Sequence, residues 1–404
     1  MTSFFLSPFF RLTAALALSA SLGGCFWLGD CQTFVVNDVG SGDRGLVVER
    51  ETGALDVVDT TRRRQVGRIE GLGDLSHASV VYGRDGATAY VFGRDGALTK
   101  VNVLTHKIQE RVQQAGNSIG GAISTDGTLV VAQNYEPGGI KVFDAQTLKL
   151  LADIPAVVDG KPSRVVGLAD IPRNRFIYSL FDAGQIWIAD LSDPAHPALT
   201  KFENIGKQPY DALVTPDGRY YIAGLFGEDG LAKIDLWAAQ PKVERILPGY
   251  GRGEERLPVY KMPHLRGWAV AGRRAYLPAI GHHEVLVVDM DTWQEVGRIP
   301  VAGQPVFVMA RPDGRQVWVN FAVPDYDTVQ VIDTQTLQII RSLQPGKAVM
   351  HMEFTPRGEA VWISSRDADH VSVIDTQDFR TLAVLPIKTP SGVFFTSRAA
   401  RTGL

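Results

Sequence analysis

The chain has 404 residues, of which 45% are hydrophobic and 21% charged, a balance that excludes a disordered or fibrous protein. Its 41 Lys and Arg residues stand against 44 Asp and Glu residues, and this balance lacks the basic surplus of a nucleic-acid-binding protein. We therefore expect no nucleic-acid partner. The two cysteines cannot make a disulfide scaffold, and no Cys-x-x-Cys pair is present for zinc, redox chemistry or covalent haem attachment.

The amino terminus predicts a secretion signal. An apolar run, Leu12–Leu22, follows the single cation Arg11 and has roughly half of the ~20 residues that a transmembrane helix needs. The run ends in Gly23-Gly24-Cys25, which resembles a bacterial lipoprotein box, so that the Cys25 thiol would carry the lipid and become the first mature residue. The protein is then expected to be a membrane-anchored periplasmic lipoprotein. An ordinary cleaved signal that happens to contain a cysteine is the alternative.

After the signal, an apolar run closed by an acidic residue recurs through the chain. Successive copies lie 42 to 46 residues apart, except for one interval of 54. Seven copies keep the acid and one has Asn in its place; the closing residues are Asp59, Asn102, Asp144, Asp190, Asp235, Asp289, Asp333 and Asp375.

A second marker lies between the closing residues. It is a tight turn, usually Asp-Gly, which supplies the positive φ of a hairpin at little steric cost. The copies are Asp85-Gly86, Asp126-Gly127, Asp217-Gly218 and Asp313-Gly314, with Asn174 and Arg357-Gly358 in the matching places.

Four short strands repeating every 40 to 50 residues are typical of a β-propeller. The predicted fold class is all-β, an eight-bladed β-propeller over residues 45–404, preceded by a cleaved signal peptide (1–24) and a tether (25–44). Blade one lacks an early strand, and Gly392–Thr396 could supply it, which would close the ring by pairing the N- and C-terminal strands. The long interval predicts a surface insertion around Pro248–Pro263.

A ligand on the axis of a propeller would contact residues that precede each inner strand and residues in the middle loop of each blade. We call these two sets of residues the first and the second ring of the hub. Imidazole binds metals and moves protons near neutral pH, and guanidinium holds carboxylates in a rigid fork. Both sets therefore suit a flat, metal-bearing molecule with carboxylates at its rim. Polar loops are normal on a propeller face, so any one arginine there is more often a solvated charge than a ligand contact. The first ring is His77, Asn117, Arg164, Tyr210 with Asp211, His264 with Arg266, Gln304, and Met350 with His351. The second is Arg50, Arg94 with Asp95, Asn134 with Tyr135, Asp182, Glu228, His282 with His283, Asp325 with Tyr326, and Arg366 with Asp367.

Several segments resemble a known family, and the likeness runs over nearly the whole mature chain. Phe181–Ile186 and Ile234–Trp237 resemble the eight-bladed haem d1 domain of cytochrome cd1 nitrite reductase. The segments Leu72–Val80, Tyr90–Gly96, Gly116–Gly121 and Asn134–Gly139 resemble the NirF family of haem d1 biosynthesis proteins.

The resemblance assigns roles to two histidines. His77 falls where the reductase has its axial ligand to the haem iron, and His264 falls where it has one of two distal histidines that protonate nitrite. The second distal position, near Gln304-Pro305-Val306, has no histidine, and the chain has no Cys-x-x-Cys-His domain to deliver electrons. Nitrite reduction is therefore not expected.

The resemblance implies a late step of haem d1 biosynthesis, in which the protein binds an iron tetrapyrrole, haem d1 or its precursor, and modifies it. The suggested step is dehydrogenation of a propionate side chain, with His77 or Asp126 as the base, although Asp126 is also explained by its turn. Arg50, Arg94 and Arg164 would hold carboxylates. No dinucleotide-binding fingerprint supports NAD as electron acceptor.

Two other readings of the same propeller stay open. The first is a non-catalytic carrier that delivers the tetrapyrrole to cytochrome cd1 nitrite reductase or to another haem d1 maturation protein. The second is an interaction scaffold with an empty channel. Besides these partners the sequence predicts contact with the membrane through a lipid anchor, and an exposed blade edge or the insertion could form a homodimer.

Overall fold

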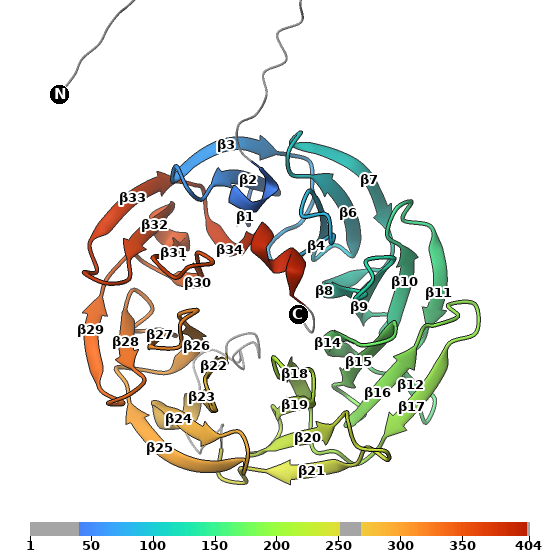
Figure 1. Cartoon of the computed structure of the whole chain (residues 1–404). Coiled ribbons are helices and arrows are strands. Elements are labelled where there is room, and N and C mark those ends of the chain that lie inside the picture. Colours follow the sequence, from blue (N-terminus) through green and yellow to red (C-terminus); the bar gives the residue numbers. More distant parts are fainter. Residues whose placement is uncertain (1–39, 251–267, 402–404) are drawn as a thin grey trace, which may run out of the picture. The chain divides into compact units, whose positions relative to one another are not determined.

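The computed structural model describes residues 40–250 and 268–401. In them, eight antiparallel sheets of four strands each follow one another around a central axis (Figure 1). The predicted eight-bladed β-propeller is confirmed. A ninth, two-stranded sheet is the hairpin β12 (Val157–Val158) and β13 (Lys161–Pro162), between blades 3 and 4.

The four strands of each blade run in order from the hub to the rim. Blade 1 consists of β34 (Pro390–Phe395), β1 (Arg44–Glu49), β2 (Ala54–Asp59) and β3 (Arg64–Ile69); blade 2 of β4 (Ser79–Tyr82), β5 (Thr88–Phe92), β6 (Ala97–Asn102) and β7 (Lys107–Gln113); blade 3 of β8 (Asn117–Ile123), β9 (Leu129–Glu136), β10 (Ile140–Asp144) and β11 (Leu150–Ile154). Blade 4 consists of β14 (Val165–Ile171), β15 (Arg175–Leu180), β16 (Gln185–Asp190) and β17 (Ala198–Phe202); blade 5 of β18 (Pro209–Val214), β19 (Tyr220–Leu225), β20 (Leu231–Asp235) and β21 (Val243–Ile246). Blade 6 consists of β22 (Ala269–Ala271), β23 (Arg274–Ala279), β24 (Glu284–Asp289) and β25 (Gln294–Pro300); blade 7 of β26 (Pro305–Ala310), β27 (Gln316–Phe321), β28 (Val329–Asp333) and β29 (Ile339–Leu343); blade 8 of β30 (Val349–Phe354), β31 (Ala360–Ser365), β32 (His370–Asp375) and β33 (Thr381–Pro386).

The ring closes as predicted, because the C-terminal strand β34 is the inner strand of blade 1. It pairs antiparallel with β1, with Gly45 opposite Phe395 and Val47 opposite Val393. The Tyr82 hydroxyl of blade 2 donates a 2.6 Å hydrogen bond to the Phe394 carbonyl, which ties the closing strand to the next blade.

The strand ends define two faces of the ring. The inner strands begin on one face, which we call the entry face, and reverse into the second strands on the other, which we call the turn face. The predicted turns form at the turn face, where Gly86, Gly127, Gly218, Gly314 and Gly358 all have φ between +64° and +76°. Asn174 takes the matching place with φ +52°.

The repeated acids also belong to the turn face, where each closes a turn after the third strand. The Asp144 carboxylate accepts backbone hydrogen bonds from Gln146 (3.1 Å) and Thr147 (2.7 Å). In the degenerate copy, the Asn102 amide oxygen accepts the same two bonds, from Leu104 and Thr105. These acids are therefore structural, which explains why Asn can replace one of them.

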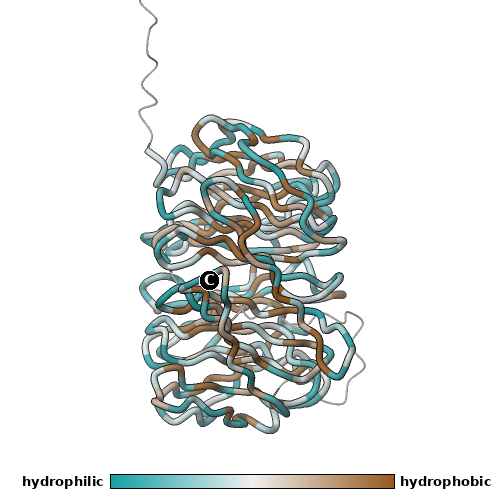
Figure 2. The backbone as a smooth tube through the Cα atoms, turned by 90° about the vertical axis from the view of Figure 1, so that its right-hand side faces the viewer, coloured by the Kyte–Doolittle hydropathy of each residue, from teal (hydrophilic) through white to brown (hydrophobic). Residues whose placement is uncertain are grey.

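The core lies between neighbouring blades rather than around one centre. Its largest fully buried side chains include Trp187, Trp318 and Trp362, on blades 4, 7 and 8. Figure 2 shows hydrophobic stretches inside the sheets and hydrophilic residues in the loops at both faces. No helix of the described residues is long and apolar enough to cross a membrane.

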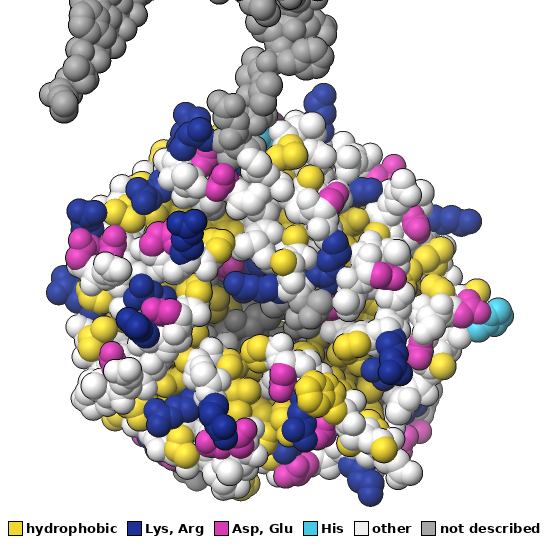
Figure 3. Space-filling view, viewed as in Figure 1, with side chains coloured by type: hydrophobic (Ala, Val, Ile, Leu, Met, Phe, Trp, Pro, Cys, Tyr) yellow, Lys and Arg dark blue, Asp and Glu magenta, His cyan; other side chains and the backbone are white. Residues whose placement is uncertain are grey.

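A short 3-10 helix, η5 (Thr396–Ala400), follows the closing strand and lies at the hub on the turn face (Figure 1). The Arg84 guanidinium holds it there, donating hydrogen bonds to the carbonyls of Ala399 (3.0 Å), Arg401 (2.5 Å) and Ser124 (3.0 Å). The other 3-10 helices of the described residues are η1 (Ser41–Asp43), η3 (Ile280–His282) and η4 (Arg366–Ala368). Figure 3 shows the turn face, hollowed at the hub, with hydrophobic side chains around the hollow and Lys and Arg side chains both beside the hollow and over the outer loops.

Candidate functional site

The hub contains a cavity of about 320 Å³ whose described walls come from every blade except blade 6. Its lining is divided between two sides. Blades 3 to 5 contribute a largely apolar side, with Ile119, Val166, Leu168 and Ala212. Blades 7, 8, 1 and 2 and helix η5 contribute the cationic and imidazole groups, which are His77, His351, Arg50, Arg366 and Arg398, together with the amide of Gln304. On this second side the polar groups lie among apolar side chains such as Val306, Phe307 and Met350, so the cavity joins an apolar wall to a mixed one.

Bulges in the inner strands shape this lining. Six inner strands shift register against their neighbours, and the shifts fall at cavity residues such as Gly120, Val306 and Met350. A bulge re-aims side chains and is common beside functional sites. The other shifts lie within Val166–Ala169, Pro209–Ala212 and Pro390–Val393.

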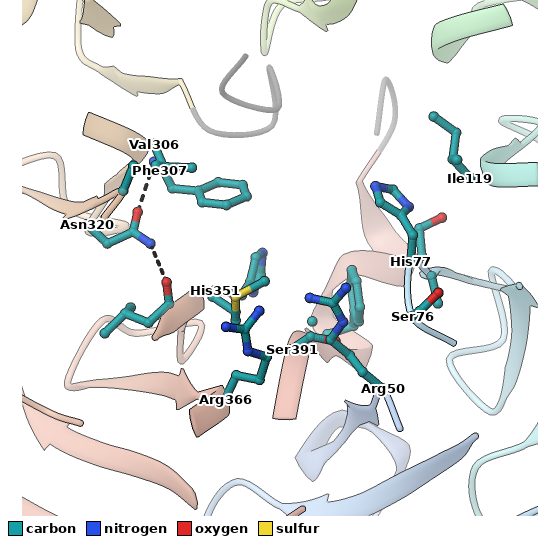
Figure 4. A pocket seen from close by; sticks show the side chains of 18 of the residues that line it. Arg50, Ser76, His77, Ile119, Val306, Phe307, Asn320, His351, Arg366 and Ser391 are labelled. Atoms are coloured by element: carbon teal, nitrogen blue, oxygen red, sulfur yellow. Dashed lines mark hydrogen bonds between the residues drawn. The ribbon is translucent and has the colours of Figure 1, made fainter. Parts of the chain in front are cut away.

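Polar side chains of the second strands fix the bulged backbone from behind. The Asn320 amide oxygen accepts from Phe307 N–H (2.9 Å) while its nitrogen donates to the Val349 carbonyl (2.9 Å), which links blades 7 and 8 (Figure 4). The Gln133 oxygen accepts from Leu168 N–H (3.0 Å) in the same way between blades 3 and 4. The hydrogen-bonding groups named here on Asn320 and Gln133 are therefore already bonded to the protein's own backbone.

His77 lies in the segment that leads into β4 and points into the cavity from the entry face (Figure 4). The blades follow one another clockwise in Figure 1 and anticlockwise in Figure 4, so the two views look at opposite faces. Leu72 and Leu75 are buried before it, and the Asp74 carboxylate accepts from Ser76 N–H at 2.8 Å. This packing fixes the segment that carries the imidazole.

A second imidazole, His351 on β30, faces the same cavity. Its ring stacks on Phe394 with centroids 5.6 Å apart, and the edge of Phe307 lies 5.7 Å away. Its Nδ1 lies 3.3 Å from the Val393 backbone nitrogen and accepts that N–H. The neutral ring must then carry its proton on Nε2, which makes this nitrogen a donor.

Two guanidinium groups from adjacent blades, Arg50 and Arg366, lie at the entry face of the cavity (Figure 4). Arg366 is paired with Asp367, whose Oδ1 lies 2.6 Å from its Nε. No carboxylate of the described residues lies within ion-pair distance of Arg50. Burial and the neighbouring charge of Arg366 lower the pKa of Arg50. An anionic group would relieve this repulsion, so the geometry favours a carboxylate here.

Arg398 of η5 lines the cavity at its turn-face end. It pairs with Glu353 of β30, with Nε 3.0 Å from Oε1, and the two side chains are 9% and 3% exposed. Its charge is therefore already neutralised, and the pair joins η5 to blade 8.

The structure places the other predicted residues away from the cavity or outside the described residues. Asp126 lies in its turn on the turn face, at the opposite end of an inner strand from the entry face that carries His77. Burial opposes its ionisation, but hydrogen bonds from Ser124, Thr128 and Asn174 outweigh burial and hold the pKa of its carboxyl below the ordinary value. These bonds explain Asp126 as a turn residue, and the position is wrong for a base acting in the cavity.

The predicted clamps Arg94 and Arg164, with Asn117 and Tyr135, are not among the residues that line the cavity. Arg164 is held by Asp182, with its Nε and Nη2 3.0 and 2.6 Å from the two carboxylate oxygens, and lies 4.2 Å from the Phe181 ring. Arg94 lies 6.0 Å from the Tyr135 ring. His264, Arg266 and Cys25, and most of the predicted insertion, lie outside the described residues.

Known proteins share this architecture and much of this sequence. Residues 39–399 match a family model described as the cytochrome D1 heme domain. Two relatives named Protein NirF, from Stutzerimonas stutzeri and Pseudomonas aeruginosa, are 62% and 58% identical over 368 residues, which cover 90% of this chain and 94% of each relative. A solved structure of the dihydro-heme d1 dehydrogenase NirN in complex with DHE is similar with a TM-score of 0.78 and 25% identity, covering 90% of this chain and 77% of that one.

Proposed function

Because the chain belongs to the cytochrome D1 heme domain family, we propose that its axial cavity binds a haem d1-type tetrapyrrole and that the protein acts late in haem d1 biosynthesis. The observation that carries this proposal is the lining of one cavity, which is largely apolar on blades 3 to 5 and places Arg366 and Arg50 among apolar side chains on blades 8 and 1. A tetrapyrrole is a flat apolar ring whose edge carries carboxylates, so it needs both kinds of wall.

The residues present fit such a substrate. The apolar side buries the macrocycle, Arg50 and Arg366 bind carboxylates in a rigid fork, and His77 supplies an imidazole nitrogen to the iron. Arg50 has no ion pair among the described residues, which supports its role as the stronger anchor. The iron, when bound, would supply the Lewis acidity and redox character of the site.

We propose further that the protein modifies the tetrapyrrole, and that the step is dehydrogenation of a propionate side chain. This step removes two protons and two electrons from the side chain and forms a carbon–carbon double bond, so it needs a two-electron acceptor as co-substrate. In the tautomer that the Val393 N–H favours, His351 carries its proton on Nε2, so it can donate a hydrogen bond or a proton to the substrate but is not the base of this step. The candidates for the base are those from the sequence, His77 and His264, of which His264 lies outside the described residues.

The test is to incubate the purified protein with the haem d1 precursor and a two-electron acceptor, and to follow the pigment by mass spectrometry. Loss of two hydrogen atoms supports the dehydrogenase. A pigment that binds tightly but leaves unchanged supports the carrier, which would deliver it to cytochrome cd1 nitrite reductase or another maturation protein. Failure to bind any tetrapyrrole would overturn both.

The cellular location of the protein is proposed from its sequence. We propose a periplasmic protein held at the membrane by a lipid on Cys25. Metabolic labelling with a fatty acid tests it: wild type should carry the label and Cys25→Ser should not. Size-exclusion chromatography with light scattering tests the proposed homodimer.

A further inference from the structure

Gln304 is an amide residue of the cavity wall whose side-chain oxygen makes no hydrogen bond within the described part of the chain. It lies immediately before β26 of blade 7, lines the cavity and is only 5% exposed. Its backbone is held, because the Gln304 carbonyl accepts from Ala322 N–H at 2.8 Å. Its side-chain oxygen, in contrast, is buried without a hydrogen-bond partner among the described residues.

Two other buried amides beside the cavity, Asn320 and Gln133, are satisfied. Asn320 bonds the backbone of blades 7 and 8, and Gln133 bonds the backbone of blade 4. Burying an amide without a partner costs free energy, and buried polar groups without partners are rare in folded proteins. Because this amide faces a cavity, a bound ligand is the natural source of the missing partner.

The chemistry of the amide limits what that partner can be. An amide is neutral and offers both a donor and an acceptor, and a half-turn of the group exchanges the two. It does not compete with guanidinium for carboxylates, which Arg50 and Arg366 would bind. It suits a neutral polar group: an oxo group accepts from its nitrogen, and a hydroxyl donates to its oxygen.

We infer that Gln304 is a specificity-determining residue of the tetrapyrrole site, whose side-chain amide hydrogen-bonds a neutral polar substituent, oxo or hydroxyl, on the bound macrocycle. The inference rests on the proposed function and adds a chemical preference to it. A site that recognised only the carboxylates of its ligand would accept any propionate-bearing haem. The amide favours macrocycles that also carry oxygen on the ring.

The experiment compares two probes on wild type and on Gln304→Met, which keeps the length of the side chain but removes the amide. The probes are haem d1, whose ring carries oxo groups, and iron protoporphyrin IX, whose ring substituents are hydrocarbons and carboxylates. We expect the variant to bind haem d1 roughly fivefold more weakly, the effect of one neutral hydrogen bond, and to bind iron protoporphyrin IX as wild type does.

Stability provides an independent readout. Since the Gln304 side-chain oxygen bonds nothing among the described residues, Gln304→Met should leave the denaturant midpoint unchanged or raise it. The matched control is Gln316→Met, because the Gln316 amide donates to the Thr376 carbonyl (3.0 Å) and accepts from Trp318 Nε1 (3.1 Å) outside the cavity. This control should lose stability and keep the wild-type preference between the probes.

The outcomes separate the two proposals. Equal weakening for both probes, or no change for either, would overturn the role of Gln304 while leaving the tetrapyrrole site intact. Failure of the wild type to bind either probe would overturn the proposed function itself.

Discussion

The Arg398 Nε lies 3.0 Å from the Glu353 Oε1, and this buried ion pair joins the C-terminal helix η5 to the inner strand of blade 8 beside the cavity. Removing one partner of a buried pair leaves an uncompensated charge and costs about 3–5 kcal/mol. We therefore expect Arg398→Met to lower the free energy of unfolding by about that amount in urea denaturation.

A second variant separates the pair from the rest of η5. Arg398→Met combined with Glu353→Met removes both charges and should recover most of the lost stability. If the double variant is no more stable than Arg398→Met alone, the pair does not act as a unit and the stabilising contribution lies elsewhere in η5.

The arginines of the cavity should matter for binding more than those outside it. Arg50→Gln and Arg366→Gln each remove a charge-assisted hydrogen bond to a carboxylate, which corresponds to about tenfold or more in the dissociation constant for haem d1. Arg94→Gln and Arg164→Gln make the same change outside the cavity and should have little effect. Titration followed by absorbance measures all four. An equal loss in the outer variants would show that the ligand lies over blades 2 to 4 instead.

His77 should control the spectrum of the bound pigment. If its imidazole ligates the iron, His77→Ala changes the axial field and shifts the visible absorption bands of bound haem d1, whereas Ser76→Ala, a neighbouring cavity residue, does not. Adding imidazole to His77→Ala should restore the wild-type bands. A spectrum that is unchanged in His77→Ala would remove the assignment.

The fold was predictable because each repeat carries the residues that its turns require. Asp-Gly forces the positive φ at the turn face, and the closing acid caps the next turn, as Asp144 does. The C-terminal segment 392–396 was also assigned correctly as the strand that completes blade 1. Turns and caps of this kind depend on a few neighbouring residues, so they can be predicted from the sequence.

The site was predictable only in part. The two predicted rings contained His77, His351 and Arg366, but nothing local distinguished them from Arg94 or Arg164, because bulges of the inner strands decide which residues face the axis. Arg398 was missed because it follows the last repeat. Asp126 was offered as one of two possible bases beside its explanation as a turn residue, and the structure supports the turn, which lies at the other face.

The stability of blade 1 should depend on pH through a buried pair of carboxyl groups. Asp56 is fully buried opposite Val47, and burial, followed by the hydrogen bond and charge of Glu49, raises the pKa of Asp56 to about 8. Arg68 bonds the Glu49 carboxylate at 2.6 Å, which keeps Glu49 as the charged member. The folded state thus holds a proton on Asp56 that the unfolded state releases near its ordinary pKa of 3.8.

The linkage between proton binding and folding gives the direction in which stability changes with pH. Between about pH 5 and pH 8 the folded protein binds more protons than the unfolded chain, so the free energy of unfolding falls as the pH rises, by at most about 1.4 kcal/mol per unit. Asp56→Asn keeps the shape of the protonated acid without titrating, so it should flatten this slope. Relative to wild type, the variant should therefore become more stable as the pH rises. Asp153→Asn makes the same change on a half-exposed carboxylate of β11 and should keep the wild-type slope. Urea denaturation across this range measures all three proteins, and parallel curves for wild type and Asp56→Asn would contradict the shared proton.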